Sequence, residues 1–197
     1  MKTDQLQSLE NLKPEAAKNG IGFGLIALIL GIISSYILVS TTSMAVVFVS
    51  PIVISIIIPI VIAIFFARDL RKKIGGYWNL RQATSGIFIM FLFSYVISVG
   101  GNFVFNKLIE KDMSSKIQRS VVNASLQLMK KQGVSEEEID KKEEEMNAEF
   151  EKKSNGTFMQ TVQGHLIGVI IIFVVSLIFG AIFRKDPPLQ FGDTSEG

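Results

Sequence analysis

Four long segments of the chain carry no Asp, Glu, Lys or Arg. They are residues 20–39, 44–67, 84–106 and 162–183. An α-helix rises about 1.5 Å per residue, so roughly 20 apolar residues cross the hydrocarbon core of a bilayer. Within that core, a helix satisfies its own backbone hydrogen bonds. The pattern therefore predicts an all-α integral membrane protein with four transmembrane helices.

The connections between these predicted helices differ in length. Residues 40–43 separate the first two helices, which we expect to be antiparallel neighbours. A basic connector, residues 68–83, joins the second helix to the third, and residues 107–161 separate the third from the fourth. Residues 1–19 are predicted to form an amino-terminal tail, and residues 184–197 a disordered carboxyl-terminal tail.

Lysine and arginine residues gather near the membrane on one side of this predicted bundle. The positive-inside rule places such a side in the cytoplasm. We therefore expect both termini to be cytoplasmic and residues 107–161 to be extracytoplasmic. Tyr77 and Trp78 are predicted to lie in an aromatic belt at the membrane interface. The basic residues that set this orientation are Lys13, Lys18, Arg68, Arg71, Lys72, Lys73, Arg81, Arg184 and Lys185.

Residues 107–161 carry the pattern of two helices joined by a turn. Apolar residues recur at three- and four-residue steps in both arms, and Gly133 between the arms is typical of a helix C-cap. Ser135 and Glu138 have the spacing of a capping box at the start of the second arm. We predict an extracytoplasmic helical hairpin whose apolar stripes meet in a seam. The predicted seam residues are Met113, Ile117, Val121, Leu128, Ile139, Met146 and Phe150.

The two arms of this predicted hairpin carry opposite net charge. Residues 107–132 hold six basic and two acidic side chains, whereas residues 135–153 hold four basic and nine acidic ones. We expect the flanking charges to attract, each exposed pair contributing about 0.2–1 kcal/mol. The alternative is that the arms lie separately on the lipid surface or are disordered.

Composition excludes several classes of function. The chain is 48% apolar and 19% charged, whereas a soluble domain is about a quarter charged. A formal net charge of +2 is too small to indicate a nucleic-acid partner. Without cysteine there are no disulfides or thiolate zinc sites, and we expect no cofactor. Because the motifs of hydrolases, phosphate-binding loops and zinc peptidases are missing as well, we expect no enzymatic activity.

Small residues form ridges along the first and fourth predicted helices. Such ridges let helix backbones approach closely in lipid. We interpret them as packing surfaces within the monomer, with a homodimer face as the alternative. The glycines concerned are Gly20, Gly24 and Gly31 in the first helix and Gly164, Gly168 and Gly180 in the fourth.

Four residues within the predicted spans are candidates for a polar pathway. Pro51 and Pro59 are expected to kink the second helix, and kinked helices occur in gates and transporters. His165 is the only histidine of the chain, and an ionisable side chain within a membrane span is a candidate for function. We interpret His165 and Asn102 first as residues of helix contacts, and alternatively as part of a pore.

Four short segments are similar to segments of a known membrane protein family. They follow the same order along the chain as in that family. These segments are Gly75-Gly76-Tyr77, Gln82-Ala83, Met129 to Glu138, and Ile182 to Pro188. On these residues the chain resembles the domain of unknown function 4199 family, small four-helix inner-membrane proteins found mainly in Bacteroidota.

This resemblance covers about residues 68–188 and implies a location in the bacterial cytoplasmic membrane. It brings no established activity and no catalytic residues. Many members have an Asp-Pro pair after the third helix, where this chain has Glu110-Lys111-Asp112. The first arm of the hairpin therefore either begins after a break or continues the third helix directly.

Together these patterns predict a non-enzymatic membrane protein that presents its hairpin for contact. The expected partners are the lipid bilayer, a second copy of the chain, or a membrane or periplasmic protein. The alternative is a small transporter or channel-like protein that uses the proline-containing second helix.

Overall fold

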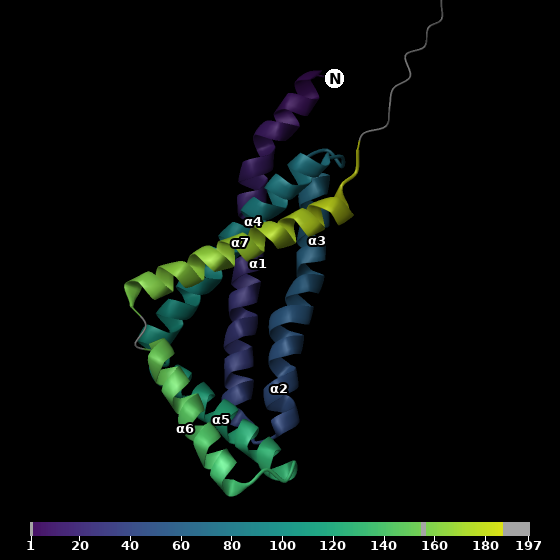
Figure 1. Ribbon diagram of the computed structural model, residues 1–197. Helices are drawn as coiled ribbons and strands as arrows, with labels where there is room; N and C mark the ends of the chain where they lie inside the picture. The colour runs from purple at the N-terminus through teal and green to yellow at the C-terminus, as the bar shows by residue number, and fades with distance from the viewer. Residues whose placement is uncertain (1, 155–156, 187–197) are drawn as a thin grey trace, which may run out of the picture.

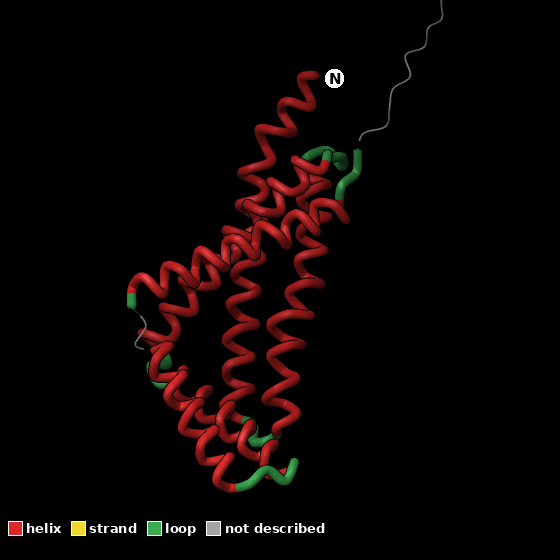
Figure 2. The backbone as a smooth tube through the Cα atoms, in the orientation of Figure 1, coloured by secondary structure: helices red, strands yellow, loops and turns green. Residues whose placement is uncertain are grey.

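The computed structural model describes residues 2–154 and 157–186 of the chain, and in this part every regular element is a helix (Figure 1). Figure 2 shows the same path as a tube, with short loops between the helices. The predicted carboxyl-terminal tail from residue 187 onward lies outside the described residues. The elements are α1 Lys2–Ser40, α2 Met44–Ile52, η1 Val53–Ile57, α3 Ile58–Lys73, α4 Leu80–Val104, η2 Phe105–Ile109, α5 Met113–Lys131, α6 Glu136–Ser154 and α7 Phe158–Phe183.

Four helical stretches in this structure are long and apolar enough to cross a membrane. They are Glu10–Ser40, Met44–Lys73, Leu80–Ile109 and Met159–Phe183, and they contain the four predicted charge-free segments. The all-helical prediction is thereby confirmed for the described residues, and the four predicted spans lie in helices that could cross a membrane. The first stretch has 31 residues. At 1.5 Å per residue it is longer than the roughly 30 Å hydrocarbon core, so its charged end extends beyond the core.

The amino-terminal residues differ from the predicted tail, because α1 begins at Lys2 and runs without interruption into the first membrane segment. Leu12 and Ala16 are buried in the largest apolar cluster of the protein. The reason is their spacing, since Leu12, Ala16 and Gly20 follow one another at four-residue steps along one helix face. The packing stripe of the membrane segment thus continues beyond the membrane.

The second membrane segment consists of α2, the π-helical turn η1 and α3 in direct succession. The wider turn lies between Pro51 and Pro59, where the amide of Ile58 donates to the carbonyl of Val53, five residues earlier. Proline lacks an amide donor, and a π-helical turn is one of the ways in which a helix accommodates the irregularity.

Helix α4 lies at the centre of the bundle and packs against α1 and α7. At Gly20 a Cβ atom would lie 2.5 Å from the carbonyl oxygen of Met90, and at Gly24 it would lie 2.9 Å from the Cα of Ser94. Only glycine allows the α1 and α4 backbones to come this close. The hydroxyl of Ser98 also donates to the carbonyl of Gly24 at 3.3 Å.

The remaining glycines of the two ridges differ in how closely they pack. In α7, Gly180 lies directly against Thr84, and a Cβ at Gly168 would lie 3.0 Å from the Tyr95 hydroxyl. Gly31 in α1 is looser, since its Cβ would lie 3.8 Å from Asn102. Gly164 has no described atom within 4 Å of its Cβ position, so it does not pack closely against the described residues. The other five glycines pack within one chain rather than on an open face.

The predicted hairpin is present as α5 and α6, which pack against each other. Glu110, Lys111 and Asp112 interrupt the helix before α5, so the first arm begins after a break. The amide of Glu138 bonds to Ser135 Oγ at 3.4 Å, as in one half of the predicted capping box. Between the described residues of the two arms we find no ion pair, only a hydrogen bond from Gln118 to Asn147 at 3.2 Å.

The seam of the hairpin differs from the predicted one on the α5 side. Ile139, Met146 and Phe150 of α6 do lie in it, but they pack against Val122, Leu126 and Met129 of α5. The predicted residues Ile117 and Val121 pack instead with Ala124 against Leu38 and Val47, at the turn between α1 and α2. Leu128 is 39% exposed, and Met113 is buried outside this cluster. Helix α5 therefore has two apolar faces, and the predicted stripe belongs to the face that contacts α1 and α2.

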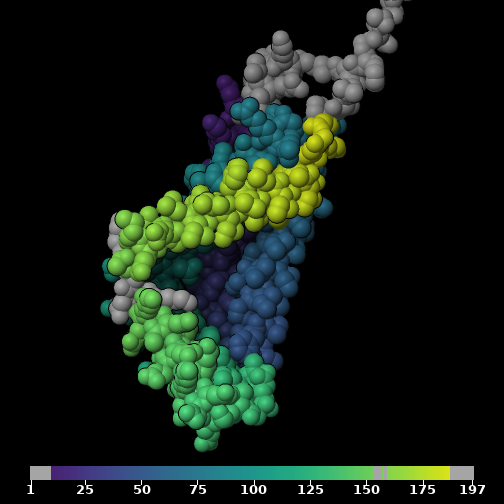
Figure 3. Space-filling model, in the orientation of Figure 1, coloured from purple at the N-terminus to yellow at the C-terminus, as the bar shows by residue number. Residues whose placement is uncertain are grey.

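Helix α7 crosses one face of the molecule, and the surface is hollowed below it, between α7, α6 and α2 (Figure 3). Its outer side presents large apolar side chains that are about half exposed or more. Such a surface is suited to contact with lipid chains. These side chains are Ile167, Ile170, Ile171, Val174, Ile178 and Ile182.

We expect Gly24→Ala to destabilise the protein, because the added methyl group would meet the α4 backbone at Ser94. Overpacking of this kind costs about 1–3 kcal/mol. The matched control is Gly164→Ala, which adds the same methyl group where no described atom lies within 4 Å. The free energy of unfolding of both variants is measured in detergent. Equal values for the two would contradict the close contact of α1 with α4.

Candidate functional site

The basic ends of α3 and α7 meet α1, near Lys18 and Asn19, at the end of the bundle opposite the hairpin turn (Figure 1). The turn after α3 reverses at Gly75 and Gly76, whose φ angles of 101° and 84° favour glycine. Trp78, just beyond it, forms a β-bridge with Lys185, with amide-to-carbonyl distances of 2.9 and 3.0 Å. Backbone hydrogen bonds thus fix the end of α7 to the connector.

Trp78 is the centre of this end and is only 1% exposed. Its indole Nε1 donates to the carbonyl of Phe183 at 2.6 Å. Trp78 therefore does not face lipid as a residue of the predicted aromatic belt would, because its ring is enclosed among the apolar residues that include Leu70 and Ile87. Tyr77, by contrast, is 44% exposed.

Two arginines of α3 lie beside the same end of α7. Arg71 Nη1 donates to the carbonyl of Phe183 at 3.3 Å, and the guanidinium carbon of Arg68 lies 6.0 Å from the centre of the Phe183 ring. The last carbonyls of a helix have no partner within the helix and carry partial negative charge. Arg71 and Trp78 together supply the missing donors to Phe183.

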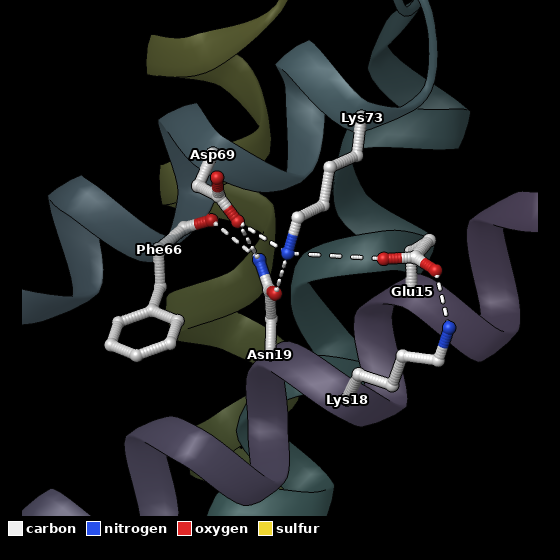
Figure 4. A network of polar contacts seen from close by, with 6 residues as sticks. All are labelled: Glu15, Lys18, Asn19, Phe66, Asp69 and Lys73. Atoms are coloured by element: carbon white, nitrogen blue, oxygen red, sulfur yellow. Dashed lines mark hydrogen bonds and ion pairs between the residues drawn. The ribbon is translucent and has the colours of Figure 1, made fainter.

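A polar network joins α1 to α3 at this end, and Asn19 is its centre (Figure 4). The amide nitrogen of Asn19 donates to Asp69 at 2.9 Å and to the carbonyl of Phe66 at 3.2 Å, while its oxygen accepts from Lys73 at 2.8 Å. Asn19 is 4% exposed, so these bonds replace the water that burial removed.

Four charged side chains surround this asparagine, and they alternate in sign. Lys73 lies 2.8 Å from Asp69 and 3.8 Å from Glu15, and Lys18 lies 2.7 Å from Glu15. Both carboxylates lie outside the charge-free membrane segments. The hydrogen bond from Lys73 lowers the pKa of Asp69, and the hydrogen bond from Lys18 lowers the pKa of Glu15.

This network is suited to holding α1 and α3 together. In the described part of the chain, no group of three or more His, Asp or Glu could hold a metal ion. Sequence reasoning missed the network, although a signal exists. Glu15 and Asn19, and likewise Asp69 and Lys73, are spaced four residues apart at the edges of two membrane segments.

The predicted polar-pathway residues lie at separate helix contacts. The Tyr95 hydroxyl lies 2.7 Å from His165 Nδ1, which joins α4 to α7. Asn102 donates to the carbonyl of Ser98 in its own helix, at 2.9 Å. Pro51 and Pro59 lie in the second membrane segment, beside α1. The structure therefore does not bring the four residues together into one site.

A family model described as "Protein of unknown function (DUF4199)" matches residues 18–185. The chain belongs to the DUF4199 family. The matched region includes the first two membrane helices as well as the segments whose residues carried the resemblance. Neither a curated protein nor a solved structure matches the chain.

For this DUF4199 protein, we expect Asn19→Ala to lower the free energy of unfolding by about 1–3 kcal/mol, because it leaves buried polar partners unpaired. The control is Asn123→Ala, at an exposed position of α5, where we expect a change within about 0.5 kcal/mol. Both variants are measured by denaturation in detergent. If Asn19→Ala were as stable as the wild type, the network would not hold α1 to α3.

The contact between Tyr95 and His165 is tested by a double-mutant cycle in the same DUF4199 protein. The variants are Tyr95→Phe, His165→Ala and the double variant. Interhelical hydrogen bonds in membranes contribute about 0.6 kcal/mol on average and up to about 1.7 kcal/mol, so we expect a coupling energy in that range. In a control cycle, Tyr77→Phe takes the place of Tyr95→Phe. We expect no coupling energy between Tyr77→Phe and His165→Ala, because Tyr77 lies in the connector at the other end of α7. Equal coupling in the two cycles would argue against the hydrogen bond.

Proposed function

We propose that this DUF4199 protein is a non-enzymatic, membrane-anchored interaction protein that presents the α5–α6 hairpin on the extracytoplasmic side of the bacterial cytoplasmic membrane. The observation that carries the proposal is the contact between the hairpin and the membrane helices. Helix α5 packs on the turn between α1 and α2 through Ala124, Leu38 and Val47. The hairpin is thus held in place by its contact with the first two membrane segments.

Helix α6 is the part of the hairpin that is free to meet a partner. Its main neighbour among the described elements is α5, against which its few apolar residues pack. Its acidic side chains are exposed, and one row of them lines a shallow surface groove. The groove residues are Asp140, Glu143, Glu144, Asn147, Ala148 and Glu151. A partner protein would therefore meet a hydrophilic, negatively charged helix face.

The position of the basic residues supports the proposed orientation in the membrane. The connector, the start of the first membrane segment and the end of α7 meet at one end, and the hairpin turn lies at the other (Figure 1). Lysine and arginine near the ends of the membrane segments favour the cytoplasm. With this end in the cytoplasm, both termini face inward and the hairpin faces outward.

Reporter fusions test this orientation. Alkaline phosphatase is active only outside the cytoplasm, whereas green fluorescent protein fused to an exported segment stays dark. We expect a phosphatase fused after Gly75 to be inactive and one fused after Asp140 to be active, with the opposite fluorescence. Equal phosphatase activity at the two sites would overturn the proposed topology.

Co-purification from native membranes tests the role of the hairpin. We expect Glu143→Gln combined with Glu144→Gln to weaken capture of the partner at least several-fold, because both side chains line the groove. The matched control, Glu145→Gln with Glu149→Gln, removes the same charge from exposed positions outside the groove and should preserve capture. Equal loss in the two variants, or full capture after residues 113–154 are replaced by a flexible linker, would contradict the proposal.

The alternative function is transport through the bundle, and the π-helical turn between Pro51 and Pro59 favours it. Solute flux in vesicles distinguishes the two functions. A transporter built on the second membrane segment would retain its flux after replacement of the hairpin, whereas an interaction protein would show no flux before or after it.

A further inference from the structure

The charged side chains in the last turn of α3 lie on two faces. One face holds an ion pair, and the other holds cations that have no carboxylate within ion-pair distance among the described residues. Asp69 and Lys73 point toward α1 and belong to the network around Asn19 (Figure 4). Arg68, Arg71 and Lys72 are spaced three and four residues apart, so they share another face of the same turn. No acidic side chain of the described residues lies within ion-pair distance of these three cations.

The end of α7 adds further positive charge to this face. Arg68 and Arg71 both lie against Phe183, the last residue of α7. Lys185 follows two residues later, and its ammonium group lies 5.1 Å from the centre of the Tyr77 ring. We call this group the α3–α7 cationic patch. It consists of Arg68, Arg71, Lys72, Arg184 and Lys185. Asp186 lies 3.0 Å from Arg184, and Asp69 lies close enough to Lys72 for their charges to interact.

The patch lies at the boundary of the hydrocarbon core. The charge-free part of the second membrane segment ends at Ala67, immediately before Arg68. The fourth ends at Phe183, immediately before Arg184. The contacts of Phe183 with Arg68 and Arg71 bring these two boundaries to the same level. Lipid phosphate groups lie at this depth of a bilayer.

We propose that the α3–α7 cationic patch binds the headgroup of an anionic phospholipid, with its phosphate between α3 and α7. Guanidinium groups match phosphate oxygens with paired N–H donors, and a bound anion offsets the repulsion among the clustered cations. A lipid fits better than a free phosphate ion because apolar surface for its chains lies directly beside the patch. Phe65 is 64% exposed and Ile182 is 67% exposed.

This proposal is independent of the hairpin, which lies at the other end of the molecule, and it requires only that the helices cross a membrane. It also gives the patch a structural consequence. The lipid would bridge α3 and α7, which otherwise meet through Arg68 and Arg71 at Phe183.

Fluorescence quenching tests the proposal in the full-length chain. Trp78 is the only tryptophan, and its indole contacts the same Phe183 carbonyl as Arg71. The protein is reconstituted in phosphatidylcholine bilayers with increasing amounts of brominated phosphatidylglycerol or, separately, brominated phosphatidylcholine. We expect phosphatidylglycerol to quench Trp78 at a clearly lower mole fraction than phosphatidylcholine. Equal quenching by the two lipids would overturn the proposal.

Charge variants place the site. Arg68→Gln with Lys72→Gln should weaken the preference for phosphatidylglycerol by about fivefold for each cation removed. Neither side chain makes a hydrogen bond or ion pair with the described residues, and the Arg71 hydrogen bond to Phe183 is kept when the Arg68 contact with the Phe183 ring is lost. Circular dichroism verifies that the fold is kept. Lys185→Gln tests the α7 side of the patch, and it should weaken the preference for phosphatidylglycerol by about fivefold.

Two controls separate specific binding from general surface charge and from a free anion. Lys130→Gln with Lys131→Gln removes two exposed charges at the hairpin end and should leave the preference unchanged. A loss equal to that of the patch variant would overturn the proposed site. Inorganic phosphate, compared with chloride at equal ionic strength, should not displace the brominated lipid. Displacement by phosphate would show that a free anion suffices and would overturn the assignment to a lipid.

Discussion

Within a bilayer, two apolar helices gain little by burying apolar surface against each other, because lipid chains offer an equally apolar environment. The arrangement of this protein therefore depends on how closely backbones approach α4. Gly20 and Gly24 bring α1 onto α4 at Met90 and Ser94, and Gly180 brings α7 onto it at Thr84. The contact at Thr84 leaves no room for a side chain. Helix α4 is central because two neighbouring helices present glycine to it.

Polar contacts fix the ends of these helices where the backbone contacts stop. At the basic end, Asn19 joins α1 to α3 and Trp78 joins the connector to α7. Each side chain is buried and has its polar atoms hydrogen-bonded. Each contact therefore fixes which groups of the two segments meet. At the other end the hairpin takes this role, because α5 packs over the turn between α1 and α2.

The two ends of the protein consequently present different chemistry. The basic end carries cations directly after the charge-free membrane segments, and the hairpin end carries an exposed acidic helix in α6. This difference unites the proposed orientation with both proposed binding partners, an anionic lipid at one end and a protein at the other. In this proposal the bundle separates the two binding surfaces.

The positions of the four membrane helices, the helical hairpin and its turn at Gly133 follow from the sequence alone. Charge-free length and helical spacing are properties of a local stretch, so no knowledge of neighbours is needed to recognise them. The tertiary structure decided which face meets which neighbour. Ile117 and Val121 follow a regular stripe, but the stripe contacts α1 and α2, while Val122 and Leu126 meet α6. Trp78 is buried and Asn19 is paired only because α3 and α7 end beside α1. A local sequence pattern does not show which distant helices meet.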